Sequence, residues 1–587
     1  MIRLLKYLKK YWWCAILAPS FMILEVAMDL VLISYMANMV DNAIPSGDLN
    51  LILKVGLMMI SVVAIGVLGG ILSGVFTNIT SYNFANDLRK DVFKKIMNLS
   101  YDQTDKFKTG SLVTRVTNDI TQIQNFVSMA LRMLIRALSF FILGIIFTLK
   151  INSRFGIVIA IVLPLEILVL LIFMKFAFPL FSIIQKKLDN LNTVVHENVS
   201  GARVVKAFCK EEYEEKRFDN ANKDYSKTLL KISKIGALLM PVLTLIIYSA
   251  QITIYLIGGN SILDFYDNKT PGDMGIKIGE ISAAITYMSM ICSSLMMIGM
   301  TFTNMARAVA SAKRINEVLD CKLDIVDGNL DLNSVSEVGT VEFKNVSFKY
   351  PGTSKNILEN INFKINKGET IAIVGSTGCG KSSLVNLIPR FYDCDSGEVL
   401  VNGINIREYK LKDLRNKVAP VLQKSDLFAG TMEENIKFGC ENASKDEVVL
   451  AARIAQALEF IESKPDKFDE YVEEKGASLS GGQKQRLSIA RAIIKKPEII
   501  IFDDSTSALD LVTEAKLYQE LRANLNDTTV ILVAQRIATA KNADRIIVLD
   551  NGSVVAIDTH ENLLTSCDIY QDIYNSQLKK EGVLDEQ

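Results

Sequence analysis

Residues 479–510 read LSGGQKQRLSIARAIIKKPEIIIFDDSTSALD, and this stretch decides the fold of the second half of the chain. Gly481 and Gly482 let backbone N–H groups approach an anion closely, and a helix that begins directly after them points its positive end outward. The apolar run 499–502 has the composition of a strand that is buried on both faces. Asp503 and Asp504 follow at the carboxyl end of this strand, where carboxylates hold Mg²⁺ and position water. We therefore predict an anion site at a helix N-terminus and a metal site at the edge of a sheet.

A second motif lies upstream, where residues 375–382 read GSTGCGKS. They fit the pattern G-x-x-x-x-G-K-[ST] between an apolar strand predicted over 370–374 and a helix predicted from Lys381. In such a loop the backbone N–H groups cradle phosphates, Lys381 reaches the β and γ phosphates, and Ser382 binds Mg²⁺. The residues that we expect to bind ATP here are Gly375, Ser376, Thr377, Gly378, Cys379, Gly380, Lys381, Ser382 and Ser383.

The two motifs together resemble the signature, Walker B and Walker A sequences of ATP-binding cassette (ABC) transporters, and the resemblance extends over the whole chain. It implies an Mg²⁺ site formed by Ser382, Gln423 and Asp503, with Gln423 in the sequence VLQK of the Q-loop. Tyr350 matches an aromatic residue that stacks on adenine, with an ordinary strand tyrosine as the alternative. The resemblance also gives an ATP-binding role to the signature residues Ser480, Gly481, Gly482 and Gln483.

Two further segments resemble parts of the family that face other domains. Glu474, just before the signature, resembles an acidic residue that meets the coupling helices of the membrane domain. Residues 507–510 match the D-loop, which crosses to the opposite subunit. Both resemblances imply a cassette that is coupled to transport.

Two catalytic positions depart from the family pattern. After Asp503 the family has a glutamate that polarises the attacking water, whereas this chain has Asp504, whose carboxylate is drawn back by one methylene. The family's switch histidine is replaced by Gln535, which can donate a hydrogen bond to a γ-phosphate but cannot become cationic. We expect Asp504, Gln535 and Gln423 to form the catalytic group of a slow ATP site.

The resemblance implies that cassettes dimerise head to tail, so each ATP lies between one chain's Walker A loop and the other chain's signature. Because this chain has a complete signature but altered catalytic positions, it resembles the degenerate-site subunit of a heterodimeric multidrug-type ABC exporter. The expected partner is a second ABC half-transporter with a glutamate and a histidine at these positions.

The composition places much of the chain in a membrane. It has 587 residues, of which 49% are apolar and 22% charged, so it is too long for one domain and too apolar for a purely soluble protein. The formal net charge is zero, which indicates no nucleic-acid partner. The 8 cysteines are scattered without a C-x-x-C pair, which argues against a zinc site and a disulfide framework.

The first half contains six apolar stretches long enough to cross a bilayer. We predict spans over 14–40, 51–77, 126–149, 155–181, 235–263 and 278–309. The basic segments 81–125 and 185–234 are cytosolic by the positive-inside rule, so both termini are expected in the cytosol and the acidic loop with Asp264, Asp267 and Asp273 outside. Within the basic segments, residues 105–111 and 210–217 resemble the coupling helices of ABC exporters, with solvated loops as the alternative.

A few polar side chains interrupt the spans. Glu25 and Asp29 are four residues apart and face one way, and a charge at mid-bilayer costs about 2.5 to 3.5 kcal/mol. They therefore bind cationic cargo or are protonated or hydrogen-bonded packing groups; Glu166, Arg132 and Arg136 raise the same question. The sixth span carries several thioethers that suit apolar ligands, although core filling is the alternative: Met288, Met290, Met296, Met297 and Met300.

These features predict an all-α transmembrane domain with six spans (1–310), a polar linker (311–339) and a cytosolic α/β P-loop ATPase domain with a helical subdomain (340–587). The expected function is ATP-driven export of amphipathic drugs, lipids or peptides across the cell membrane, with Mg²⁺ as cofactor and membrane lipid as a contact. The alternatives are a siderophore-type uptake transporter of the same fold and a nucleotide-sensing regulatory subunit.

Overall fold

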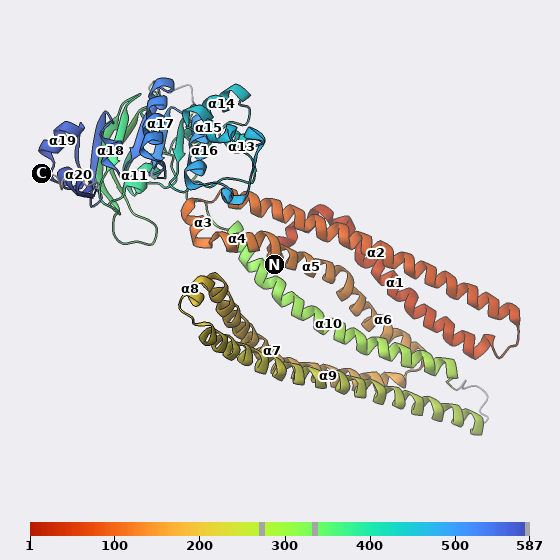
Figure 1. Cartoon of the computed structure of the whole chain (residues 1–587). Coiled ribbons are helices and arrows are strands. Elements are labelled where there is room, and N and C mark those ends of the chain that lie inside the picture. The colour runs from red at the N-terminus through yellow and green to blue at the C-terminus, as the bar shows by residue number, and fades with distance from the viewer. Residues whose placement is uncertain (269–275, 331–337, 507, 581–587) are drawn as a thin grey trace. The chain divides into compact units, whose positions relative to one another are not determined.

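The computed structural model describes residues 1–268, 276–330, 338–506 and 508–580 and divides into two compact units (Figure 1). The first unit comprises Met1–Met97 and Gly110–Cys321, and the second comprises Asn98–Thr109 and Lys322–Gln587. Asp273 of the expected outer loop, residues 331–337 of the expected linker and Ser507 of the expected D-loop lie outside the described residues.

The first unit is helical. Within the described residues, six helices are long and apolar enough to cross a membrane, which confirms the predicted number of spans. Its α-helices are α1 (Trp12–Asn38), α2 (Leu49–Met97), α4 (Thr109–Thr114), α5 (Ile120–Met129), α6 (Ile135–Ile151), α7 (Phe155–Ser200), α8 (Ala202–Ala207), α9 (Glu211–Asn268) and α10 (Ile278–Leu319). A 3₁₀ helix, Ile2–Tyr11, precedes α1, and π-helical turns occur at Met39–Ala43, Arg115–Asp119 and Ala130–Leu134.

Long helices of this unit pack in pairs. Helices α1 and α2 run side by side, as do α7 and α9, which α8 joins at one end (Figure 1). Between α1 and α2 the approach depends on small residues, since a Cβ added at Gly69 would lie 3.1 Å from the carbonyl oxygen of Phe21. At the start of α10, the Asp41 carboxylate accepts hydrogen bonds from the backbone N–H groups of Gly279 (2.6 Å) and Glu280 (3.1 Å), which stabilises the positive helix end.

Three polar residues of the spans form an ion-paired group between α1 and α6. Arg136 Nη1 lies 3.2 Å from Glu25 Oε1, and Arg136 Nη2 lies 3.6 Å from Asp29 Oδ2. Gly70 of α2 makes room for this group, because its added Cβ would lie 2.9 Å from Glu25 Oε2. The arrangement supports a packing role for Glu25 and Asp29, although the group has one more carboxylate than cation.

Three predicted boundaries differ from the structure. The short helix expected over 105–111 is α3 (Tyr101–Phe107), which begins earlier because Ser100 and Gln103 form a capping box. The short helix expected over 210–217 is α8, and most of 210–217 instead forms the start of α9, because Gly201 and the left-handed Cys209 (φ 50°) bound the short helix upstream. Helix α10 continues through residues 311–319 of the expected linker.

The second unit contains three sheets, with strand orders β2-β1-β4-β5, β12-β11-β3-β10-β9-β6 and β7-β8. The strands are β1 (Val341–Phe348), β2 (Leu358–Ile365), β3 (Thr370–Val374), β4 (Ser396–Val401), β5 (Ile404–Asn405), β6 (Val418–Val421), β7 (Gly430–Thr431), β8 (Tyr471–Val472), β9 (Ile499–Asp503), β10 (Thr529–Val533), β11 (Arg545–Asp550) and β12 (Ser553–Asp558). Besides α3, the α-helices are α11 (Lys381–Leu387), α12 (Leu411–Lys417), α13 (Met432–Lys437), α14 (Lys445–Ile454), α15 (Leu458–Glu462), α16 (Gly481–Ile493), α17 (Leu511–Asn524), α18 (Ile537–Ala540), α19 (His560–Ser566) and α20 (Asp568–Lys580).

The six-stranded sheet positions the site. Strands β11, β3, β10, β9 and β6 are parallel, and β9 is buried along its whole length, as its apolar sequence predicts. The register pairs Val421 with Phe502, Asp503 with Val533, and Val533 with Ile373. The carboxyl ends of β6, β9, β10 and β3 therefore meet at one edge, so the segments that follow these strands converge there.

Candidate functional site

The loop between β3 and α11 has the backbone that a phosphate cradle requires. Gly378 (φ 85°) and Gly380 (φ 104°) occupy the left-handed region, which favours glycine. A Cβ added at Gly375 would lie 2.1 Å from the carbonyl oxygen of Leu549, whereas one added at Gly378 would meet open space. The glycines thus let the loop turn tightly on the protein side and leave space at Gly378.

Lys381 and Ser382 open helix α11, where the sequence predicts them. The Lys381 ammonium donates to the carbonyl oxygens of Gly375 and Ser376, both at 2.8 Å, and so closes the loop on itself. A phosphate bound at this loop would meet a cation held at the N-terminus of a helix.

Two of the three residues expected to bind Mg²⁺, Ser382 and Asp503, have side chains that fit that role, while the amide of the third, Gln423, donates to Asp504. Ser382 Oγ donates to Asp503 Oδ1 at 2.7 Å, which joins the start of α11 to the end of β9. A serine hydroxyl and a buried carboxylate are oxygen ligands of the kind that Mg²⁺ prefers, and a bound Mg²⁺ would neutralise phosphate charge there. Burial raises the pKa of Asp503, and the Ser382 hydroxyl and the Lys381 charge oppose that rise.

The three residues expected to be catalytic lie together. Gln423 Nε2, which follows β6, donates to Asp504 Oδ2 at 3.0 Å. Gln535 Nε2, which follows β10, donates to the same oxygen at 2.5 Å. Asp504 itself has a left-handed backbone (φ 50°), which an aspartate adopts at less cost than most residues. One carboxylate oxygen therefore receives two amide donors from two different strand ends.

The charge of Asp504 is unfavourable in this setting. Burial raises the pKa of its carboxyl, and the neighbouring Asp503 carboxylate adds to the rise, while the hydrogen bond from Gln423 opposes it. A raised pKa makes the ionised carboxylate a stronger base, yet an attacking water would compete with two amides for Oδ2. A water that used Oδ2 would require one of the two amides to move away.

Tyr350 lies beside the Walker A loop rather than within the catalytic group. Its hydroxyl is 3.0 Å from Ser383 Oγ, on the first turn of α11. Its ring packs edge-on against Phe348 and Tyr392, with centroids 5.1 and 5.3 Å away. Phe348 and Tyr392 thus hold in place the Tyr350 ring, which by the family resemblance would stack on adenine.

The signature residues are carried by another element, α16. Ser480 Oγ accepts the Gln483 N–H (3.3 Å), and Gln483 Oε1 accepts the Ser480 N–H (3.0 Å), so the two form a capping box. A Cβ added at Gly482 would lie 3.2 Å from the Ala508 carbonyl oxygen, while one added at Gly481 would meet open space. These contacts are distinct from those that join Gln423, Asp504 and Gln535.

The sequence interpretation missed an aromatic cluster next to this site. Tyr392, soon after α11, contacts both Tyr350 and Tyr101 of helix α3, and Tyr101 also packs on Phe391 with ring centroids 4.6 Å apart. The signal in the sequence is the pair Phe391 and Tyr392 shortly after the Walker A helix. A chain of rings therefore leads from Tyr350 to α3.

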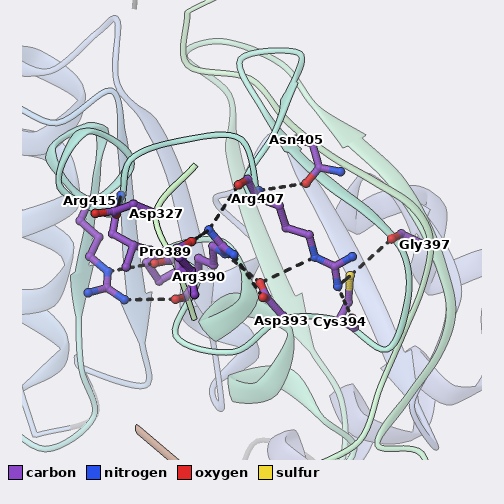
Figure 2. A network of polar contacts seen from close by, with 11 residues as sticks. Asp327, Pro389, Arg390, Asp393, Cys394, Gly397, Asn405, Arg407 and Arg415 are labelled. Carbon is purple, nitrogen blue, oxygen red and sulfur yellow. Dashed lines mark hydrogen bonds and ion pairs between the residues drawn. The ribbon is translucent and has the colours of Figure 1, made fainter. Parts of the chain in front are cut away.

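A polar network beside this cluster was also missed. Figure 2 shows Arg390, which donates to both carboxylate oxygens of Asp393 at 2.8 and 3.2 Å, and Arg415, which donates to the carbonyl oxygens of Pro389 and Arg390. Arg390 also donates to the Val326 carbonyl at 3.0 Å. The network anchors residues 326–330 to the ATPase unit, since the N–H groups of Gly328 and Leu330 bond to the carbonyl oxygens of Tyr409 and Glu408.

Comparison with known proteins agrees with these features. Residues 15–304 match the ABC transporter transmembrane region, and residues 358–507 match the ABC transporter family. The chain is 37% identical to the uncharacterized ABC transporter ATP-binding protein YfiB of Bacillus subtilis over 99% of both chains. It is 34% identical to the ATP-dependent lipid A-core flippase of Pseudomonas fluorescens, over 89% of this chain and 85% of that protein.

The solved structure of a bacterial Atm1-family ABC exporter with ATP bound is similar, with a TM-score of 0.78 and 25% identity over 96% of this chain and 98% of that one. Both halves of the chain are thus matched, and the whole chain aligns with its relatives. The chain belongs to the ABC transporter family, with the exporter fold, in which hydrolysis of ATP by the α/β domain drives transport by the six-helix domain.

Proposed function

We propose that this chain is one subunit of a heterodimeric ABC exporter whose two ATP pockets differ in speed. Its own Walker A pocket would hold ATP and hydrolyse it slowly. Its signature would complete the faster pocket on the partner subunit. The observation that carries the proposal is the shared oxygen of Asp504, which accepts both the Gln423 and the Gln535 amide.

The geometry supports a slow pocket for two reasons. The Asp504 carboxylate is shorter by one methylene than a glutamate, and a displacement of about 1 Å of a reacting group can cost on the order of 10²-fold in rate. Gln535 also directs its amide N–H to Asp504 and cannot supply the charge-assisted bond of a protonated histidine to a γ-phosphate.

The signature supports the second half of the proposal. The capping box of Ser480 and Gln483 forms a regular start to α16, and both glycines are present. An intact helix N-terminus of this kind attracts phosphate, so the chain retains what a partner's pocket needs.

The cargo is proposed to be amphipathic. The flippase relative is named for a lipid, and the transmembrane unit contains an apolar cavity of about 230 Å³ between α7, α9 and α10. An apolar cavity accepts the hydrophobic part of a drug, lipid or peptide by burial of apolar surface. The cell membrane, with both termini in the cytosol, is the proposed location.

The test compares the chain alone with the chain and its partner in lipid vesicles. We expect substrate-dependent ATPase activity and transport only for the pair, at the rates of about 1 to 10³ s⁻¹ that enzymes typically reach. Equal hydrolysis in two equivalent pockets of a homodimer would overturn the heterodimer proposal. A conformational change that depends on ATP but is not accompanied by transport of cargo would favour a regulatory subunit instead.

A further inference from the structure

Helix α20, at the end of the described chain, bonds directly to the segment that carries Gln535. Gln577 of this helix donates from its Nε2 atom to the carbonyl oxygen of Gln535 at 2.8 Å. Its Oε1 atom accepts the backbone N–H of Ile537, also at 2.8 Å. Both polar atoms of one side-chain amide are therefore used on residues 535–537, which we call the switch segment.

Burial of α20 fixes the position of Gln577. Tyr570 is completely buried, and Ile573 and Tyr574 pack against the same apolar core, to which Ile537 also belongs. Tyr570, Ile573, Tyr574 and Gln577 follow the spacing i, i+3, i+4 and i+7 and so share one face of α20. Helix α20 lies against α18, which begins within the switch segment (Figure 1). The Gln577 amide is thus carried by a helix that the core holds in place.

The chain just after the switch segment is held from another side. Thr539 Oγ1 donates to Glu514 Oε1 at 2.9 Å, and Thr506 Oγ1 donates to the same oxygen at 2.7 Å. Glu514 belongs to α17 and is buried. Gln577 and Glu514 together therefore restrict the backbone that follows Gln535, which limits the positions that the Gln535 side chain can reach.

We infer that Gln577 is a positioning residue for ATP hydrolysis, which holds the Gln535 amide on Asp504 and so slows the reaction. Gln535 and Gln423 both donate to Asp504 Oδ2, at 2.5 and 3.0 Å. A carboxylate oxygen accepts about two donors, so a water at Oδ2 takes the place of one amide. Because Gln577 orders the backbone at residue 535, the Gln535 side chain loses less entropy on bonding to Asp504. This inference rests on the proposed slow pocket and adds a cause of its slowness that lies on α20.

A matched pair of substitutions on α20 tests the two hydrogen bonds. Gln577→Met keeps the approximate size of the side chain and removes both bonds. Gln571→Met makes the same change on the same helix, where Gln571 Nε2 donates to the carbonyl oxygen of Leu564 at 2.6 Å instead of to the switch segment. Hydrogen exchange of the full chain in lipid nanodiscs, followed by mass spectrometry, should become faster at residues 535–541 in the Gln577 variant alone. Unchanged exchange there would contradict the inference.

Single-turnover hydrolysis in this chain's pocket, with any partner's pocket inactivated, tests the effect on the reaction. We expect Gln577→Met to raise the rate by about 2- to 10-fold, the factor that one neutral hydrogen bond typically contributes, and Gln571→Met to leave it unchanged. The affinity for a fluorescent ATP analogue should stay the same, because Gln577 bonds to the switch segment and not to the Walker A loop. An equal or lower rate in the Gln577 variant, or the same increase in the Gln571 variant, would overturn the inference.

A double-mutant cycle separates positioning from general support of the fold. If Gln577 acts through Gln535, Gln577→Met should have no further effect on the rate in a Gln535→Ala protein, whereas a purely structural role would add its full effect. Additive effects would therefore rule out the positioning role. If Gln577→Met does not fold, Gln577→Glu decides, because it keeps the acceptor for the Ile537 N–H and loses the donor to Gln535. It should also raise the rate, and an unchanged rate would contradict the inference.

The wild-type rate in the same assay tests the proposed function separately. A wild-type pocket as fast as its partner's would contradict the proposed slow pocket. A slow pocket that neither Gln577 variant accelerates would contradict only the positioning role of Gln577. The change of rate on substitution decides the inference in both cases.

Discussion

The Asp504 carboxylate joins two strand ends, because the amides of Gln423 and Gln535 both donate to its Oδ2 oxygen. Its backbone is left-handed, at φ 50°. A glutamate at this position would have a side chain longer by one methylene, but it would adopt this backbone conformation at a greater cost. An aspartate at this position therefore combines a shorter side chain with a lower cost of the left-handed backbone.

Restoring the family residues at positions 504 and 535 should accelerate the hydrolysis of ATP in this chain's pocket. We expect Asp504→Glu together with Gln535→His to raise ATP turnover of the heterodimer by up to about 10²-fold at this site, because the carboxylate moves about 1 Å closer to the water. Single-turnover hydrolysis with the partner's pocket inactivated measures this rate. An unchanged rate would show that geometry outside these two residues limits hydrolysis.

Removing the charge of Asp504 should stabilise the protein at neutral pH. Burial raises the pKa of this carboxyl in the folded protein, so the folded state binds the proton more tightly than the unfolded state does. The ionised group therefore costs stability as the pH rises through the interval between the unfolded and the folded pKa.

We accordingly expect Asp504→Asn to be more stable than the wild type at pH 7 and equal to it at a pH below the usual range of aspartate. Thermal unfolding in detergent across this pH range measures the difference. A variant that is less stable at pH 7 would show that the two amide hydrogen bonds outweigh burial.

At the scale of elements, the ion-paired group between α1 and α6 fixes how two spans meet. Arg136→Met would leave Glu25 and Asp29 without their cation, and removing one partner of a buried ion pair costs about 3 to 5 kcal/mol. We expect a loss near the lower end, because Asp29 is 37% exposed. Thermal unfolding of the purified chain measures the loss.

A triple variant, Arg136→Met with Glu25→Gln and Asp29→Asn, is the control for that experiment. It should recover much of the stability, since no unpaired charge remains. Arg154→Met, in an exposed position, should change stability by less than about 0.5 kcal/mol. Full stability of Arg136→Met alone would argue that both carboxyls are neutral in the membrane.

At this scale, the chain of aromatic rings between Tyr350 and α3 should also support binding of the nucleotide. Tyr392 contacts Tyr350 and Tyr101, and each aromatic pair contributes about 0.5 to 1.5 kcal/mol beyond its buried area. Tyr392→Ala should therefore weaken ATP binding by about 2- to 10-fold, measured with a fluorescent ATP analogue. Tyr392→Phe keeps the ring and should bind ATP like the wild type; equal binding by the alanine variant would separate Tyr392 from the nucleotide site.

At the scale of the whole molecule, the Walker A loop and the signature of this chain should contribute unequally to the ATPase activity of the heterodimer. Under the proposed function, Lys381 would serve the slow pocket of this chain, whereas Gly482 would belong to the signature that completes the partner's fast pocket. We expect Gly482→Asp to reduce heterodimer ATPase at least tenfold, because the carboxylate repels phosphate and its Cβ presses on the Ala508 carbonyl. Lys381→Ala should reduce it far less.

Steady-state ATPase of the reconstituted pair measures both variants. The matched experiment places the equivalent two substitutions in the partner, where the order of effects should reverse. Equal losses from Lys381→Ala and Gly482→Asp in this chain would indicate two equivalent pockets.

Much of the fold follows from local patterns. Apolar length predicts the six spans, and the fixed spacing of the Gly375 loop predicts a phosphate cradle between a strand and a helix. The predicted positions of the two short helices are wrong, because the capping box of Ser100 and Gln103 and the turn at Cys209 set the ends of these helices. Helix ends depend on single side chains, and periodicity does not record them.

The sequence by itself determined the membrane and ATPase halves, the family, and the two positions, 504 and 535, where the chain departs from the family pattern, because each depends on contiguous residues. Only the tertiary structure decided that Gln423 and Gln535 share one oxygen of Asp504, that Arg136 pairs with Glu25, and that Glu166 has no cationic partner among the residues that the structure describes. The physical reason is that these contacts join segments far apart in the chain. Strand order and helix packing bring such segments together, and both are set by burial across a whole unit rather than by neighbouring residues.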